Sequence, residues 1–216
     1  MSKVIVLGGG LCGLASALML ARDGHEVTVL ERDPGPVPES PERAWEAWER
    51  GGVAQFRQAH YMQPRGRQVL GAELPDVLAA IREAGAAELH WPRMMPPTIE
   101  DRSPRPGDEE LMTVTARRPT LEQAMASAAE RQEGLTVRRG VAVARLETHV
   151  HAGSVHVTGV RTEQGATLYC DLVVDATGRR SRMPALLLEA GGPEAAEEGG
   201  DSAFVYYTRF FRSADG

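Results

Sequence analysis

The stretch from Val4 to Gly13 joins a short apolar strand to a glycine-rich turn. It reads Val-Ile-Val-Leu-Gly-Gly-Gly-Leu-Cys-Gly, which is a G-x-G-x-x-G motif with glycines at 8, 10 and 13. An Ala/Leu-rich segment follows, and a second apolar run ends in Glu31. Strand, glycine turn, helix and strand in this order predict a nucleotide-binding βαβ unit. The predicted strands are residues 3–8 and 26–31, and the predicted helix is residues 11–23.

Each glycine of the motif has its own physical reason. Gly8 lets the chain turn sharply out of the strand, and Gly10 lets the backbone approach a pyrophosphate closely. Gly13 lets the helix pack tightly on the sheet. The first helical residues, Leu11 and Cys12, contribute unpaired N–H groups at the positive end of the helix dipole. A glycine-rich turn without a ligand is the alternative, but it leaves the run of three glycines and the acidic residue after the second strand unexplained.

Glu31 stands eighteen residues after Gly13, at the end of the second predicted strand. A carboxylate there accepts hydrogen bonds from both hydroxyls of an adenosine ribose. The same charge argues against a 2′-phosphate at this place, because two negative groups would meet. The sequence therefore favours NAD or FAD, and Arg32, the next residue, joins the candidate cofactor contacts.

The overall charge argues against several other partners. The 216 residues include 24 basic and 30 acidic side chains, a formal charge of −6. This balance gives no electrostatic case for binding nucleic acid or an anionic membrane. No apolar run approaches the roughly 20 residues of a membrane span, and the chain enters its first strand without a signal peptide, so we expect a cytoplasmic protein. Cys12 and Cys170 have no metal-like neighbours and are expected to be packing residues.

The middle of the chain departs from a simple NAD-binding fold. Residues 33–110 are rich in proline and contain two predicted helices, at 65–74 and 76–84. A turn at Pro104–Asp108 predicts a hairpin between strands near 94–99 and 111–116. A helix is expected at 119–133, after Pro119 and before Gly134.

The remainder is predicted to be mainly β-structure. Alternating runs near 142–149, 154–161 and 166–169 predict a β-meander. The wholly apolar run 172–174 suits a buried parallel strand. The aromatic run 203–212 is also predicted to be a strand.

Taken together, these features resemble the single-component FAD-dependent monooxygenases of the aromatic-hydroxylase type, represented by p-hydroxybenzoate hydroxylase. The resemblance implies an α/β fold: a Rossmann-like FAD-binding domain with a β-meander, plus part of a substrate-domain β-sheet. The implied division of the chain has four segments. They are 1–90 for the FAD-binding βαβ unit and insertion helices, 91–118 for a hairpin of the substrate domain, 119–192 for the return to the FAD-binding domain, and 203–216 for the start of the substrate-domain sheet.

The resemblance also assigns roles to individual residues. Arg50, in Arg-Gly-Gly-Val, resembles an arginine that approaches the FAD diphosphate, a task that suits the bidentate guanidinium; a solvated arginine at a helix end is the alternative. Arg118, in Arg-Pro-Thr-Leu, matches a helix start whose side chain reaches the ribityl and phosphate region. Val143 matches an apolar position whose backbone touches the adenine. His60 is interpreted as a structural histidine rather than an acid–base catalyst, because the sequence gives it no partner.

Asp175 and Gly178 resemble the family's second cofactor motif. Its usual form is Asp-Gly, whereas this chain has Asp-Ala-Thr-Gly, a form shared by many flavin reductases and epoxidases. Arg179 and Arg180, which follow, suit either a nicotinamide phosphate or an exposed cap. The family's third motif, Gly-Asp, has no counterpart after residue 181. We therefore expect the N-terminal part of a longer protein, inactive alone, whose partner is the C-terminal remainder or another chain.

The implied function is that of an FAD-dependent oxidoreductase. A monooxygenase that uses NADH or NADPH and inserts one oxygen atom of O₂ into a small organic substrate is the leading hypothesis. A flavin-dependent reductase or dehydrogenase of the same fold is the nearest alternative, and a non-catalytic nucleotide-binding module is the next. A flavin-dependent halogenase is disfavoured, because Lys3 at a strand start is the sole lysine. No catalytic residue and no metal ligand is assigned.

Overall fold

The computed structural model describes residues 1–200, 203, 205, 207–211 and 214. Its centre is a parallel sheet of four strands in the order β10-β1-β2-β6. All three pairings are parallel and in continuous register. The α/β class is therefore confirmed. The strands are β1 (Lys3–Leu7), β2 (Glu26–Glu31), β6 (Leu135–Arg139) and β10 (Leu172–Asp175).

Both faces of this sheet are apolar, because successive side chains of a strand point to opposite sides. Val4 and Val6 face the helices α1 (Leu11–Arg22) and α5 (Arg118–Arg131), where Leu14 is also buried. Ile5 and Leu7 join a second cluster with the meander and α6 (Met183–Glu189). The meander consists of β7 (Val143–His151), β8 (Ser154–Thr162) and β9 (Thr167–Tyr169), as the sequence predicts.

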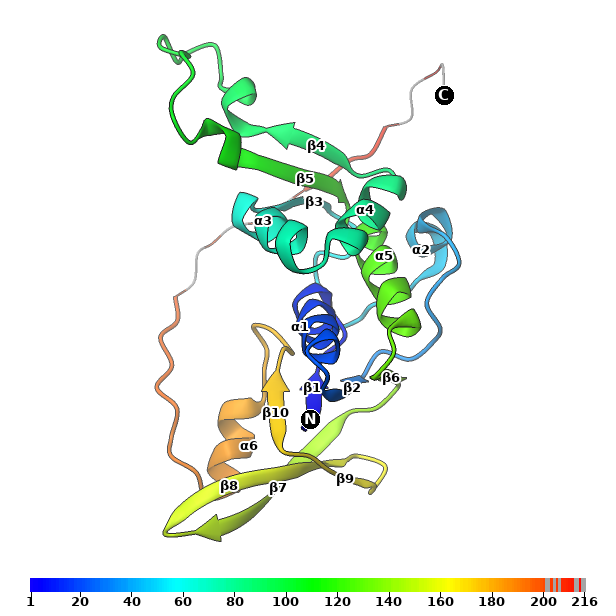
Figure 1. Cartoon of the computed structure of the whole chain (residues 1–216), viewed down its shortest axis with the longest axis vertical. Coiled ribbons are helices and arrows are strands. Elements are labelled where there is room, and N and C mark those ends of the chain that lie inside the picture. Colours follow the sequence, from blue (N-terminus) through cyan, green and yellow to red (C-terminus); the bar gives the residue numbers. More distant parts are fainter. Residues whose placement is uncertain (201–202, 204, 206, 212–213, 215–216) are drawn as a thin grey trace.

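A second, antiparallel sheet has the order β3-β5-β4. Figure 1 shows it at one end of the long axis, beside α3 and α4, while the meander lies at the other end and α1 lies between them. Helix α2 lies near α5 in the same view. The elements are α2 (Pro41–Ala47), β3 (Ala59–Met62), α3 (Pro64–Glu73), α4 (Pro75–Glu83), β4 (Ala87–His90) and β5 (Met112–Arg117).

The predicted hairpin exists, but the position predicted for its first strand is wrong. The hairpin partner of β5 is β4 at 87–90, not a strand at 94–99, and a 3₁₀ turn, Trp91–Met94, follows β4. Pro92, Pro96 and Pro97 lack the N–H groups that a strand needs for pairing, so the strand ends before them. Strand β3 was not predicted.

The predicted aromatic strand near the end of the chain has no counterpart among the described residues. Residues 203, 205 and 207–211 belong to no helix or strand. Residues 204, 206 and 212 of that prediction lie outside the described residues. The predicted strand is therefore wrong over the described residues of this run. The division into four segments stays a prediction.

Candidate cofactor site

The glycine turn after β1 shows why each glycine is required. Gly8 has a φ of +99°, and a Cβ there would lie 2.7 Å from the carbonyl oxygen of Ala176. A Cβ on Gly13 would lie 1.9 Å from the Gly8 carbonyl oxygen. Gly10 differs, because no heavy atom lies within 4 Å of its Cβ position. Two glycines therefore permit internal packing, and Gly10 leaves open space for a ligand.

Helix α1 begins directly at this open space. Gly10 is its N-cap residue and supplies no side chain to bond the first N–H groups, and the first turn contains no acidic residue. Leu11 is half-buried and Cys12 is exposed. The positive end of the helix dipole thus lacks an anion from its own first turn, which is the arrangement that binds phosphate.

Glu31, the last residue of β2, lies against the glycine turn. Its side chain is 6% exposed, and Oε2 accepts a hydrogen bond of 2.8 Å from the Gly9 N–H. Oε1 accepts a second bond of 2.8 Å from the Asp33 N–H. A Cβ on Gly9 would lie 3.0 Å from Oε2, so the middle glycine of the run makes room for this carboxylate.

Arg50 lies inside this cluster rather than in solvent, with a side chain that is 2% exposed. Its Nη2 donates to Glu31 Oε2 at 2.7 Å and to the Gly9 carbonyl oxygen at 3.2 Å. Nε donates to Asp33 Oδ2 at 3.2 Å, and Nη1 donates to Glu122 Oε2 at 2.8 Å. The solvated alternative is therefore wrong. The contact of Arg50 with a diphosphate stays a prediction, because this geometry commits four of its five N–H donors to the protein.

Glu122 is a buried acid that sequence reasoning did not assign to the site. It is 0% exposed, and its Oε1 accepts a bond of 2.7 Å from Arg118 Nε. The same carboxylate therefore holds Arg50 and Arg118, which lie on different segments. No local sequence pattern separates Glu122 from a solvated helical Glu, because its burial comes from the packing of the first turns of α5.

His60 contacts the guanidinium group of Arg118 on the side away from Glu122. The Nε2 atom of His60 lies 3.1 Å from Arg118 Nη1, which must be the donor. Burial, and then the positive charge of Arg118, lower the pKa of His60 to about 4. The ring is therefore neutral at physiological pH, which agrees with the structural interpretation of this histidine.

Asp175 organises the turn after β10. Its Oδ1 accepts from the Thr177 N–H at 3.0 Å and from Thr177 Oγ1 at 2.6 Å, and Oδ2 accepts from Ser181 Oγ. Gly178, with a φ of +82°, lies in this turn. The backbone of this turn is the surface that contacts Gly8. The Asp175 segment thus borders the glycine turn, while its direct contact with a cofactor stays a prediction.

Two further predicted contacts lie at the edge of the cluster. Val143 is half-buried and packs in the meander cluster. The neighbouring Val141 instead donates its N–H to the Glu31 carbonyl oxygen at 2.9 Å. Arg32 is exposed, and its Nη2 lies 3.2 Å from the Cβ position of Gly52. Their roles toward a cofactor stay predictions.

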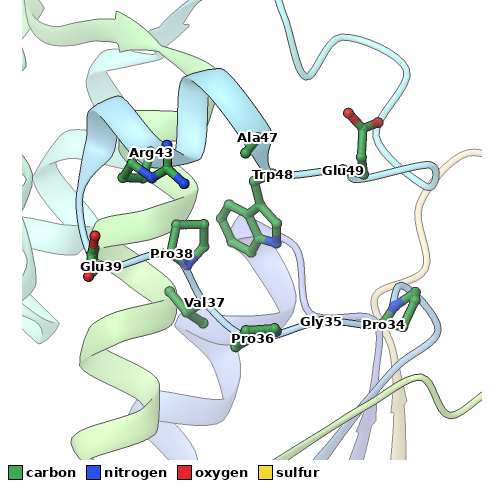
Figure 2. A pocket seen from close by; sticks show the side chains of 10 residues that line it. All are labelled: Pro34, Gly35, Pro36, Val37, Pro38, Glu39, Arg43, Ala47, Trp48 and Glu49. Carbon is green, nitrogen blue, oxygen red and sulfur yellow. The ribbon is translucent and has the colours of Figure 1, made fainter.

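A shallow groove of about 510 Å³ lies beside this cluster, between the end of α2 and the loop that follows β2. Figure 2 shows the Trp48 indole directed from the end of α2 toward the proline-rich loop. The guanidinium carbons of Arg50 and Arg139 lie 5.1 and 5.8 Å from the centre of this ring. The groove is lined by Pro34, Gly35, Pro36, Val37, Pro38, Glu39, Arg43, Ala47, Trp48 and Glu49.

Arg139 is an under-satisfied cation next to Glu31, its register partner in the sheet. Its side chain is 10% exposed, and its Nε and Nη2 atoms are buried without a hydrogen-bond partner among the described residues. Burial, and then the charge of Arg50, lower the pKa of Arg139. The Trp48 Nε1 atom has no partner among these residues either.

These residues fit the adenosine diphosphate half of a dinucleotide. Open space at Gly10 and the uncapped helix start suit a diphosphate, and Glu31 suits ribose hydroxyls. Within the described part of the chain, no group of three or more His, Cys, Asp or Glu residues is arranged to hold a metal ion. None of the described helices combines the length and apolar character that crossing a bilayer requires.

A family model described as an FAD binding domain matches residues 1–196. Protein Rv3254 of Mycobacterium tuberculosis is 27% identical over 237 residues, covering 98% of this chain and 45% of its own length. A D-amino acid dehydrogenase of Sinorhizobium medicae is 60% identical over 38 residues, which cover 18% of this chain and 9% of the dehydrogenase. The chain thus spans less than half the length of either relative.

Solved structures show a similar fold. The structure of pqsL, described as a probable FAD-dependent monooxygenase from Pseudomonas aeruginosa, has a TM-score of 0.60 at 16% identity. It covers 87% of this chain, and this chain covers 45% of it. A structure of PqsL in complex with 2-aminobenzoylacetate has a TM-score of 0.61 at 17% identity, with 87% and 46% coverage. At this identity the likeness establishes the fold alone.

Proposed function

This chain belongs to the FAD-binding domain family, and from that membership we propose that it binds FAD at the glycine turn and Glu31. We further propose that the protein is an FAD-dependent oxidoreductase. Its proposed reaction is monooxygenation: one oxygen atom of O₂ enters a small organic substrate, and NADH or NADPH supplies the electrons.

The contact between Gly9 and Glu31 carries the proposal. A 2.8 Å hydrogen bond fixes the carboxylate beside a turn whose outer side, at Gly10, is open. The N-terminus of α1 would hold the diphosphate. A carboxylate offers roughly four acceptor positions, and Gly9, Asp33 and Arg50 fill three of them. One ribose hydroxyl therefore takes the remaining position, and the second requires Arg50 to release Glu31.

When bound, the flavin supplies the electron-transfer and oxygen chemistry, and the chain supplies binding and orientation. The described residues around the site suit binding and orientation. Arg118 is held by Glu122 on one side and by His60 on the other. His60, with a pKa of about 4, is neutral and is a poor proton donor at physiological pH. We therefore assign it to orienting Arg118.

The monooxygenase assignment is supported by the family and by the fold shared with the pseudomonal protein. The complex of that protein with 2-aminobenzoylacetate supports a small organic molecule as the substrate class. The reductase alternative gains no comparable support, since the dehydrogenase match spans 38 residues, 18% of this chain. Because the chain spans less than half of these proteins, the activity, the substrate, the nicotinamide and the cytoplasmic location remain proposals.

The test has two stages. The purified protein is titrated with FAD, and binding is followed by quenching of flavin fluorescence. Oxygen uptake is then measured with NADH or NADPH and a panel of small aromatic substrates. Absence of FAD binding contradicts the cofactor proposal. Nicotinamide oxidation with substrate reduction, and without stoichiometric oxygen incorporation, contradicts the monooxygenase proposal and favours the reductase.

A further inference from the structure

Glu122 is an acidic side chain placed on the buried face of α5. It is 0% exposed, and each of its carboxylate oxygens accepts a bond from a different arginine, Arg118 at 2.7 Å and Arg50 at 2.8 Å. Burying a charge costs several kcal/mol, and a paired buried charge often adds no more stability than an apolar residue of the same volume. Stability alone is therefore a weak explanation for this arrangement.

The two arginines lead from Glu122 in different directions. Arg50 reaches the Glu31 carboxylate and the Gly9 carbonyl oxygen at the glycine turn. Arg118 reaches His60, which lies on β3 of the antiparallel sheet. One continuous chain of hydrogen bonds therefore joins the two sheets, and Glu122 is its midpoint.

We propose that Glu122 is a positioning residue that couples the ribose end of the cofactor site to Arg118 and the β3-β5-β4 sheet. The part of this inference that involves the cofactor rests on the proposed function. Two guanidinium groups share one carboxylate, so a change in the contacts of Arg50 alters the share of negative charge that Arg118 receives. When ribose hydroxyls occupy Glu31, Arg50 gives up a contact there and is held more strongly by Glu122.

A neutral side chain at 122 would break this arrangement in a specific way. The amide of Gln offers one acceptor oxygen and one NH₂ donor group. One arginine would then keep its bond, and the other would face a donor and a neighbouring cation. The loss of coupling is therefore a sharper sign of the proposed role than a loss of stability.

The first experiment needs no cofactor. A double-mutant cycle of Arg50→Gln and Arg118→Gln is measured by urea unfolding, in the wild-type and the Glu122→Gln backgrounds. We expect the two substitutions to be coupled by about threefold or more in the unfolding equilibrium constant, and the coupling to vanish with Glu122→Gln. The matched control is Glu130→Gln, on the same helix but half-exposed, which should leave the coupling unchanged. Equal coupling in both backgrounds overturns the proposal.

The second experiment measures the response of His60, which lies at the far end of the chain of hydrogen bonds. The NMR signals of the His60 ring are followed while FAD is added. We expect a shift in the wild type, none in Glu122→Gln, and a partial shift in Glu122→Asp, which keeps the charge and serves if the Gln variant does not fold. The same shift in all three proteins contradicts the relay. If the wild type binds no FAD, the proposed function fails, while the unfolding cycle still decides the role of Glu122.

Discussion

The Nη2 atom of Arg50 lies 2.7 Å from Oε2 of Glu31, and the two side chains are 2% and 6% exposed. The residue proposed to accept ribose hydroxyls is thus already paired with a buried cation. A ligand that donates one hydrogen bond to Glu31 can share the carboxylate with Arg50. A 2′-phosphate cannot, because it would bring a second negative group to Glu31. The pair therefore favours a ribose with free hydroxyls.

Glu31→Gln should weaken FAD binding by tens-fold. The substitution keeps the shape but removes the charge that would accept two ribose hydroxyls, each bond being worth roughly 1.5–3 kcal/mol. Binding is measured by fluorescence titration, and folding by circular dichroism. Glu26→Gln, at the other and exposed end of β2, is the matched control. FAD affinity within about twofold of the wild type would show that Glu31 is not the ribose acceptor.

Gly10→Val should abolish FAD retention and preserve the fold. A side chain at residue 10 meets no protein atom within 4 Å, but it occupies the space in which a diphosphate would lie. The contrasting variant is Gly13→Val, which should unfold the domain, because its Cβ would overlap the Gly8 carbonyl. Gly199→Val, also in open space, is the neutral control. Normal flavin content in purified Gly10→Val would place the phosphates elsewhere.

The glycine turn could be predicted from the sequence because its requirements are local. Gly8, Gly10 and Gly13 are needed by the conformation and close contacts of a segment only a few residues long, and Glu31 follows from the end of one strand. Helices 64–73 and 75–83 carry their start signals, Pro64 and Pro75, within their own sequence.

Features that depend on distant partners could not be predicted in this way. Strand β3 has four residues, and its pairing partner β5 lies about fifty residues later in the chain. Glu122 is a Glu on a helix, and helical Glu residues are ordinarily solvated. Its burial follows from the packing of α5 against α1, α2 and α4, which no local pattern records. The contacts of Arg50 likewise require Glu31, Asp33 and Glu122 to be brought together by the fold.

Arg139→Met should leave the free energy of unfolding unchanged or raise it by about 1 kcal/mol. The nearest carboxylate of Arg139 belongs to Glu130, 3.7 Å from Nε, and its Nε and Nη2 atoms have no hydrogen-bond partner among the described residues. The charge of Arg50 opposes a second cation there, which is one reason that the pKa of Arg139 is lowered. Methionine fills a similar volume without a charge to desolvate.

The measurement is urea unfolding at neutral pH without cofactor. Arg138→Met, on the same strand but exposed, is the matched control and should change stability by less than about 0.5 kcal/mol. A loss of more than about 2 kcal/mol in Arg139→Met would mean that Arg139 makes a strong interaction in the folded protein, and the description of an under-satisfied cation would then be wrong.

His60 should make the folded protein less stable in mild acid. Its pKa is lowered from 6.5 to about 4 in the folded state, by burial and by the charge of Arg118. Between these two values the unfolded chain binds a proton more readily than the folded chain, so stability falls as pH decreases from 6.5 toward 4. Above pH 6.5 His60 is neutral in both the folded and the unfolded chain, so it no longer lowers the free energy of unfolding.

The size of this effect is on the order of 1–3 kcal/mol, after an allowance for partial solvent screening. His60→Gln should remove it, because the amide oxygen can still accept from Arg118 and does not titrate. Urea unfolding across this pH window measures the slope. His149→Gln, on the exposed end of β7, is the control and should keep the wild-type slope. If His60→Gln keeps the same acid sensitivity, the ring does not remain neutral in the folded protein, and the bond that Arg118 is inferred to donate to it would have to be rejected.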